Sequence, residues 1–205
     1  MITIIKLRDL FANLAEKGMA QVFADWEMLV GFEATSDAQH IRIAPDIADI
    51  ADTIDLRHVV VETKVEKGEA ALGSIFFAFP NTLVIDVIAD LLMIPETARE
   101  TKAREGLSEN DVEAFREMAN LLCGSWNRTF QELERDLRIS QSVDDLQVWT
   151  GDGKTPTLQE SVGSGGRVAY VPLEVDCAGT PHEALIVLPF EVAIQVAEEF
   201  YRAAA

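Results

Sequence analysis

The chain has 205 residues, of which 48% are hydrophobic and 25% are charged, proportions that exclude wholesale disorder. Its 17 Lys and Arg residues against 35 Asp and Glu residues give a net charge of −18, which disfavours nucleic acid and anionic membrane surfaces as partners. No apolar run reaches the ~20 residues that would cross a bilayer, and the N-terminus lacks a secretory signal, so we expect a cytoplasmic protein without membrane insertion.

The first predicted element is a long amphipathic helix near the N-terminus. Mostly apolar residues recur there at intervals of three or four, which places them on one face of an α-helix. These residues are Leu7, Phe11, Leu14, Gly18, Val22, Trp26 and Leu29. Residues 59–65 and 75–79 then predict two strands on either side of Gly68, an antiparallel hairpin. Pro80 ends the second strand, since proline cannot continue a strand ladder and its fixed φ suits the start of a helix.

A second copy of this pattern follows a polar, highly charged segment at residues 95–106, which we interpret as a linker or an exposed helix. Ser108 and Asp111 form a variant of the capping box ahead of a long helix over residues 109–134. The apolar face of that helix consists of Val112, Phe115, Ala119, Leu122, Trp126, Phe130 and Leu133. Strands at residues 168–175 and 185–188 around Gly179, followed by Pro189 and a last helix, complete the copy.

The two copies indicate an internal duplication. Pro80 aligns with Pro189, and Phe11 of the first long helix aligns with Phe115 of the second. We therefore predict a single domain over residues 1–205, built of a first half (1–94), a connecting segment (95–106) and a second half (107–205). The predicted fold class is α/β, with two pseudo-symmetric halves that share one β-sheet, each half a long helix plus antiparallel strands and a trailing helix.

The second long helix carries a polar stripe opposite its apolar face. The stripe consists of Glu113, Glu117, Asn120, Gly124 and Asn127. Such stripes are most often solvated surface, but Asn is a mediocre helix former and Gly costs about 1 kcal/mol against Ala within a helix, so solvent exposure alone does not favour them. Gly124 leaves the surface bare beside Asn120, and Leu121 flanks the stripe as an apolar rim. We therefore interpret the stripe as a contact surface.

Glu117 and Asn120 lie one turn apart and point to the same side of the helix. An amide does not titrate, so the two are a poor acid–base pair, and two oxygens without His, Cys or further carboxylates make a poor metal site. An amide can hold a water by donating and accepting at once, and a carboxylate can pair with a lysine of another protein. The pair therefore suits the orientation of a water against an electrophile that a partner supplies with its metal.

The segment Glu117-Met-Ala-Asn120-Leu-Leu-Cys-Gly124 resembles the Glu-x-x-Asn-x-x-x-Gly signature of the CheC/CheX/FliY family of chemotaxis phosphatases. The two-halved architecture resembles the same family over most of the chain. The resemblance implies a CheC-like fold and a phosphatase that accelerates hydrolysis of the aspartyl phosphate of a CheY-like response regulator. Asn120 would orient the attacking water, and Glu117 would pair with the active-site lysine of the regulator. The phosphorylated receiver domain would carry its own Mg²⁺, so no cofactor or metal is expected on this chain.

Two positions depart from the family pattern. Glu113 stands where the family has Asp or Ser, and Gln141 and Ser142 stand where it has a proline. If these departures disable the site, the chain would be a non-catalytic regulator-binding or flagellar-switch-like adaptor of the same fold. A third alternative is a structural α/β protein whose polar stripe has no function. The residues leave open which regulator is the target, and whether the chain forms a homodimer.

In the first long helix, the positions aligned with Glu113, Glu117 and Asn120 hold the same residue types in swapped order. They are Asp9, Asn13 and Glu16. A swapped pair would place the amide where the lysine of the partner belongs, so we expect this copy to be inactive. One intact site resembles the CheX arrangement more than the two-site CheC arrangement.

Other motifs do not predict a site. Gly153-Lys154-Thr155 lacks the upstream glycine of a P-loop and precedes Pro156, so we interpret it as a turn. Cys123 is predicted to be a core residue rather than a nucleophile, and two cysteines without a CxxC motif predict neither a disulfide framework nor a zinc site. A catalytic triad has no support, because there is no Gly-x-Ser-x-Gly and the histidines are widely separated, at His40, His58 and His182.

Overall fold

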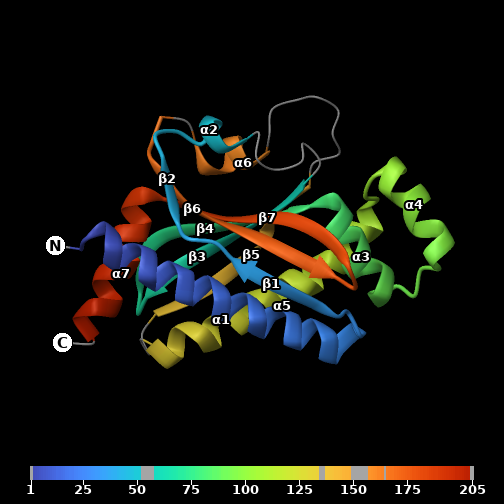
Figure 1. The fold of residues 1–205 in the computed structure, drawn as a ribbon, viewed down its shortest axis with the longest axis horizontal. Coiled ribbons are helices and arrows are strands. Elements are labelled where there is room, and N and C mark those ends of the chain that lie inside the picture. The colour runs from blue at the N-terminus through green and yellow to red at the C-terminus, as the bar shows by residue number, and fades with distance from the viewer. Residues whose placement is uncertain (1, 52–57, 134–136, 149–156, 164, 204–205) are drawn as a thin grey trace.

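A computed structural model describes residues 2–51, 58–133, 137–148, 157–163 and 165–203. Within these ranges, one curled antiparallel sheet carries two long helices on one face and two short helices on the other (Figure 1). The elements of the first half are α1 (Ile4–Val30), β1 (Ala34–Ala38), β2 (Arg42–Ala44), α2 (Ala48–Ala51), β3 (His58–Lys67), β4 (Ala70–Pro80) and α3 (Asn81–Leu91). After α4 (Glu96–Glu105), the elements of the second half are α5 (Glu109–Leu133), β5 (Leu137–Val148), α6 (Thr157–Val162), β6 (Val168–Cys177), β7 (Thr180–Pro189) and α7 (Phe190–Ala203).

The two halves exchange strands. The order across the sheet is β1-β6-β7-β4-β3-β5, with β2 also paired to β6, and the hairpins of the two halves meet where β4 pairs with β7. The strand that follows each long helix pairs with the hairpin of the other half, β1 with β6 and β5 with β3. Neither half therefore holds a complete sheet, which confirms the predicted sharing of one sheet. The common origin of the halves stays a prediction.

Local signals in the sequence placed the predicted elements correctly. The two hairpins turn at Gly68 and Gly179, which have φ of 59° and 90°, values that glycine adopts without steric cost. Pro80 and Pro189 are the last residues of β4 and β7, and helices α3 and α7 begin at the next residue. Residues 95–106 contain α4, so the helix alternative for this segment is the correct one.

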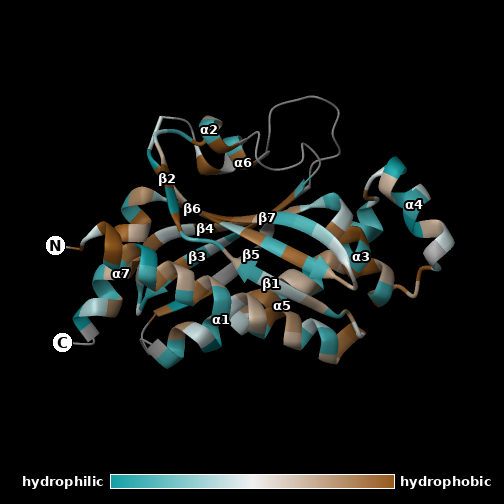
Figure 2. Ribbon diagram, in the orientation of Figure 1, coloured by the Kyte–Doolittle hydropathy of each residue, from teal (hydrophilic) through white to brown (hydrophobic). Residues whose placement is uncertain are grey.

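The main core lies between the sheet and the pair α1 and α5, and hydrophobic positions recur along both helices (Figure 2). The two helices run antiparallel: Trp26 stacks edge-on against Phe115, at 6.3 Å between ring centroids, while Gly18 meets Trp126 further along. One predicted core residue is wrong. Leu29 is 60% exposed, because the buried positions at this end of α1 are Phe23 and Trp26, with Val30 partly buried, so the buried face has turned away from Leu29.

A smaller cluster covers part of the other face of the sheet. Residues of α2 and α6, such as Ile50 and Leu158, pack there against Val60 and Phe76 of the hairpin β3–β4. The sequence analysis did not predict α2, α6, β1, β2 or β5, since these segments lack a strong period.

The close approach of α1 to α5 predicts that a side chain at Gly18 destabilises the fold. A Cβ at Gly18 would lie 2.6 Å from the ring of Trp126, whose side chain is 1% exposed and cannot move aside. We expect Gly18→Ala to lower the free energy of unfolding by roughly 1–3 kcal/mol, as overpacking does. Gly124→Ala is the matched control, because a Cβ there meets nothing within 4 Å, and it should stabilise α5 by up to about 1 kcal/mol. Urea denaturation measures both; a neutral Gly18→Ala would contradict the tight packing.

Candidate functional site

The helix that carries the polar stripe is fixed at its start. The Ser108 hydroxyl donates to Asp111 Oδ2 at 2.6 Å and the Ser108 backbone N–H donates to the same oxygen at 2.8 Å, which confirms the predicted capping box. Lys102 of α4 pairs with this carboxylate at 2.8 Å. Although burial opposes its ionisation, the hydrogen bonds from Lys102 and Ser108 hold the pKa of Asp111 below its ordinary value. The capping box therefore also ties the connecting segment to α5.

The predicted pair lies on the open side of α5. Glu117 and Asn120 are both exposed, and no hydrogen bond or ion pair joins the side chain of either to another residue of the described chain. Glu113 is also exposed, at 69% of its side chain, with Arg116 3.5 Å away. Gly124 is half-buried, and a Cβ at this position would meet nothing within 4 Å. A carboxylate and an amide are thus presented side by side with free hydrogen-bonding groups, next to bare backbone.

Asn127, the fifth predicted member of the stripe, has a different role. Its Oδ1 accepts a hydrogen bond from the backbone N–H of Ile139, and its Nδ2 donates to the carbonyl oxygen of the same residue, both at 2.6 Å. Assignment of Asn127 to the open stripe was wrong, because the amide satisfies the backbone of β5 instead of facing solvent. The double hydrogen bond holds the C-terminal part of α5 against the sheet.

A polar cluster that the sequence analysis missed ties α5 to α1. The carboxylate of Asp25 on α1 accepts hydrogen bonds from the Ser125 hydroxyl and from the Arg128 guanidinium, both on α5. The indole N–H of Trp26 donates to the carbonyl oxygen of Met118 at 3.1 Å. In the sequence, the one signal for this cluster is Ser125, a polar residue among the apolar positions of α5. In the structure, Ser125 is completely buried. These contacts fix the position of α5 beside α1.

The degenerate copy lies on the outer side of α1. Asp9, Asn13 and Glu16 are all exposed. Because α1 and α5 are antiparallel, the pair on α1 lies near the opposite end of the two-helix face from Glu117 and Asn120. The structure therefore presents the two pairs separately, and the inactivity of the first copy stays a prediction.

The remaining candidates lie in the core or outside the described ranges. Burial raises the pKa of the Cys123 thiol to about 12, which agrees with its predicted place in the core. Burial, with the nearby carboxylate of Asp86, raises the pKa of Cys177 to about 12 as well. Gly153-Lys154-Thr155 falls outside the residues that the structure describes. In the part of the chain that is described, no group of three or more His, Cys, Asp or Glu could hold a metal ion, and no helix could cross a membrane.

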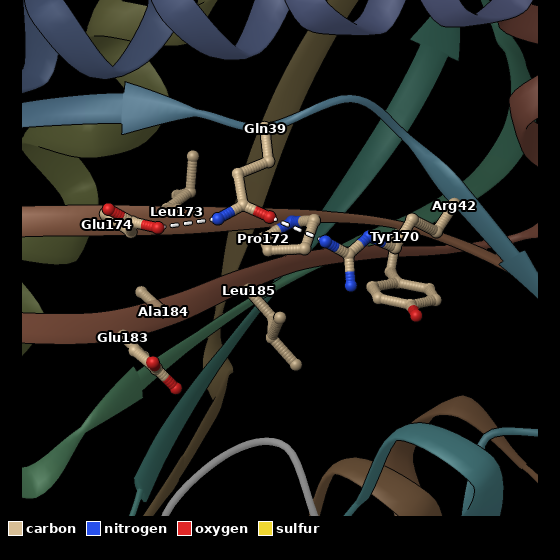
Figure 3. A pocket seen from close by; sticks show the side chains of 9 residues that line it. All are labelled: Gln39, Arg42, Tyr170, Pro172, Leu173, Glu174, Glu183, Ala184 and Leu185. Carbon is tan, nitrogen blue, oxygen red and sulfur yellow. Dashed lines mark hydrogen bonds between the residues drawn. The ribbon is translucent and has the colours of Figure 1, made fainter.

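A pocket lies away from this face, on the side of the sheet opposite to α1 and α5. Figure 3 shows Gln39 between the carboxylate of Glu174 and the guanidinium of Arg42, with a 2.7 Å hydrogen bond to each. These three polar side chains are therefore hydrogen-bonded to one another, and Tyr170 and Leu185 also line the pocket. The polar pair of α5, by contrast, stands on the convex surface of a helix, a shape that suits a protein partner better than a small molecule.

Comparisons with known proteins identify the fold. No protein-family model and no curated protein matches the sequence. Among solved structures, Thermotoga maritima FliY matches 98% of this chain and 99% of its own at 21% identity, with a TM-score of 0.77. The FliM middle domain from H. pylori matches 97% of this chain and 99% of its own (9% identity, TM-score 0.71). CheX from Vibrio vulnificus matches 86% of this chain and 97% of its own (18% identity, TM-score 0.53). The chain therefore has the CheC-like fold that the sequence resemblance implied.

The capping box of α5 predicts a pH dependence of stability. Since the folded state holds the pKa of Asp111 below its unfolded value of about 3.9, the stabilisation is present above about pH 4 and is lost as the pH falls through the lower folded value. Asp111→Asn should lower the free energy of unfolding at neutral pH by about 1 kcal/mol, and the difference from wild type should shrink below about pH 4. Urea denaturation at pH 3 to 7 tests this, with the exposed Glu113→Gln as control. A difference that grows towards acid pH would contradict the assignment.

Proposed function

We propose that the protein is a phosphatase that accelerates hydrolysis of the aspartyl phosphate of a CheY-like receiver domain. The observation that carries the proposal is the exposed Glu117–Asn120 pair, free of partners in the described chain, on an α5 helix that is fixed by contacts at both ends, in a chain with the CheC-like fold. The sequence signature around the pair supports the same function.

In the proposed hydrolysis, this chain only has to orient the attacking water. The Asn120 amide holds a water through one donated and one accepted hydrogen bond and aims its oxygen at the phosphorus atom. The water oxygen forms a bond to phosphorus as the bond to the aspartyl oxygen breaks, which yields inorganic phosphate and a free carboxylate. Phosphoryl transfer depends mostly on position and charge stabilisation, and the receiver domain supplies Mg²⁺ for the latter. No side chain of this protein has to titrate.

Docking depends on charge. The Glu117 carboxylate pairs with the active-site lysine of the receiver domain, which fixes the register of Asn120 against the phosphoryl group. Glu113, one turn away, adds negative charge to the same face, and the net charge of −18 favours encounter with a basic surface. Gly124 lets the partner approach close to the helix backbone, because no side chain stands there.

A second candidate is a non-catalytic adaptor of a flagellar switch. The observation that supports it is the match to the FliM middle domain, which spans 97% of this chain with a TM-score of 0.71. FliM from H. pylori has been crystallised in complex with FliG. An adaptor would use the same open face of α5 to bind a receiver domain without hydrolysing its phosphate.

The Asn120→Ala variant separates these functions. It should remove the acceleration, with a fall of about 100-fold or to the spontaneous rate, because the water is no longer oriented. Binding of the receiver domain should change little. Phosphate release from the phosphorylated CheY-like receiver domains of the same cell measures the rate, with Asn13→Ala on α1 as matched control. Wild-type protein that leaves the spontaneous rate unchanged would reject the phosphatase in favour of the adaptor.

The Glu117→Lys variant tests the docking role. It sets two positive charges against each other and should weaken binding of the receiver domain at least roughly tenfold. Titration calorimetry with a receiver domain loaded with beryllofluoride measures this, since the complex is then stable. Glu16→Lys makes the same charge change on α1 and should have little effect. Equal losses in the two variants would point to net charge rather than to a specific ion pair.

A further inference from the structure

The C-terminal end of α1 exposes two large apolar residues. Met28 is 83% exposed and Leu29 is 60% exposed, although Leu29 belongs to the apolar face that α1 buries elsewhere. Apolar side chains scattered singly are ordinary on a surface, whereas neighbouring ones beside a polar site are typical of protein contacts, in which Met is enriched. Two other neighbouring pairs, Ile4–Ile5 and Leu92–Met93, are exposed as well, so what distinguishes Met28 and Leu29 is their place beside the candidate site.

The contacts of α1 place this pair beside the candidate site. Met28 and Leu29 follow Asp25 by three and four residues, so they share its side of the helix, and Asp25 faces α5 through Ser125. Trp26 reaches the carbonyl oxygen of Met118, the residue after Glu117. Because the helices are antiparallel, moving along α1 from Asp25 to Met28 corresponds to moving along α5 from Ser125 back towards Glu117. Met28 therefore lies closer to the level of Glu117 than Asp25 does.

The α5 side of this junction is apolar too. Leu121, which follows Asn120, is half-buried and packs against the edge of the main core. Met28, Leu29 and Leu121 together form what we name the apolar rim. It borders the Glu117–Asn120 pair on the side of α1.

Two of the three rim positions are charged in the first copy, and the third, Leu29, corresponds to Leu133. In the alignment of the two halves, Leu121 corresponds to Lys17 and Met28 corresponds to Glu132, and both charged residues are exposed. At these two positions the surroundings of Asn13 and Glu16 are therefore charged where those of Glu117 and Asn120 are apolar. This difference between the copies is independent of the swapped order of Asn13 and Glu16. Both differences single out the pair on α5 as the intact one.

We propose that the apolar rim is a docking anchor for the phosphorylated receiver domain, a proposal that rests on the proposed function of the adjacent pair. The occupant is a receiver-domain surface with an apolar side chain next to its active-site lysine, because Leu121 of the rim lies one helical turn from Glu117 on α5. The rim contributes affinity and register, while Asn120 acts on the water. Since two of the three rim positions are charged in the first copy, each chain binds one receiver domain.

The test uses two exposed Leu–Met pairs of the same chain. The double variant Met28→Gln and Leu29→Gln removes the rim on α1, and the double variant Leu92→Gln and Met93→Gln is the control, since Leu92 is 46% and Met93 90% exposed beyond the end of α3. The probe is the CheY-like receiver domain of the same cell, loaded with beryllofluoride for calorimetry and phosphorylated for rate measurements. We expect the rim variant to raise Kd and KM about tenfold, with the rate at saturation unchanged, and the control to match wild type. Wild type should bind one receiver domain per chain.

The outcomes separate the two proposals. A rim variant with wild-type Kd and KM would overturn the anchor, as would an equal loss in the control or two receiver domains bound per chain. If wild type binds without accelerating phosphate loss and the rim variant binds more weakly, the anchor holds and the phosphatase fails. If wild type accelerates phosphate loss and the rim variant does so with the same KM, the phosphatase holds and the anchor fails. A wild type that binds no receiver domain would overturn both.

Discussion

The antiparallel packing of α1 against α5 on one face of the sheet is the contact on which the rest of the structure depends. Each helix turns its apolar face into a shared aromatic core, and the absence of a side chain at Gly18 lets the ring of Trp126 fit between them. With that face buried, the opposite face of α5 has to point outward. The same packing that stabilises the fold therefore exposes Glu117 and Asn120 to solvent. Three polar contacts, centred on Asp111, Asp25 and Asn127, hold the helix in this position.

A helix held in this way suits a reaction in which the protein mainly positions a water. The backbone of α5 is already held in place before the partner arrives, so little binding energy is spent on ordering the helix. The proposed division of labour is simple: the partner brings the phosphoryl group, the metal and a lysine, and this chain brings an amide, a carboxylate and an apolar rim. An adaptor would need the carboxylate and the rim but not the amide. Asn120 is thus the residue on which the two candidate functions differ.

Much of the fold could be predicted from the sequence, because the signals were local. The period of the two long helices, the turns at Gly68 and Gly179 and the prolines at the strand ends each act within a few residues. The exchange of β1 and β5 between the halves could not be predicted, since alternation within a strand does not specify its neighbour. Asn127 was misplaced for a similar reason: its partner is the backbone of a strand that the sequence did not reveal. The exposure of Glu117 and Asn120 could be predicted from periodicity, whereas the cluster around Asp25 depends on a contact between helices far apart in the sequence.

The crystal structure of the protein bound to a beryllofluoride-loaded CheY-like receiver domain, with its Mg²⁺, is the most direct test of the central claim. The account predicts that α5 lies across the active site of the receiver, with the Asn120 amide within hydrogen-bond distance of a water in line with the beryllium and the Glu117 carboxylate on the lysine. A receiver domain seated on another face, with Asn120 still in solvent, would contradict it.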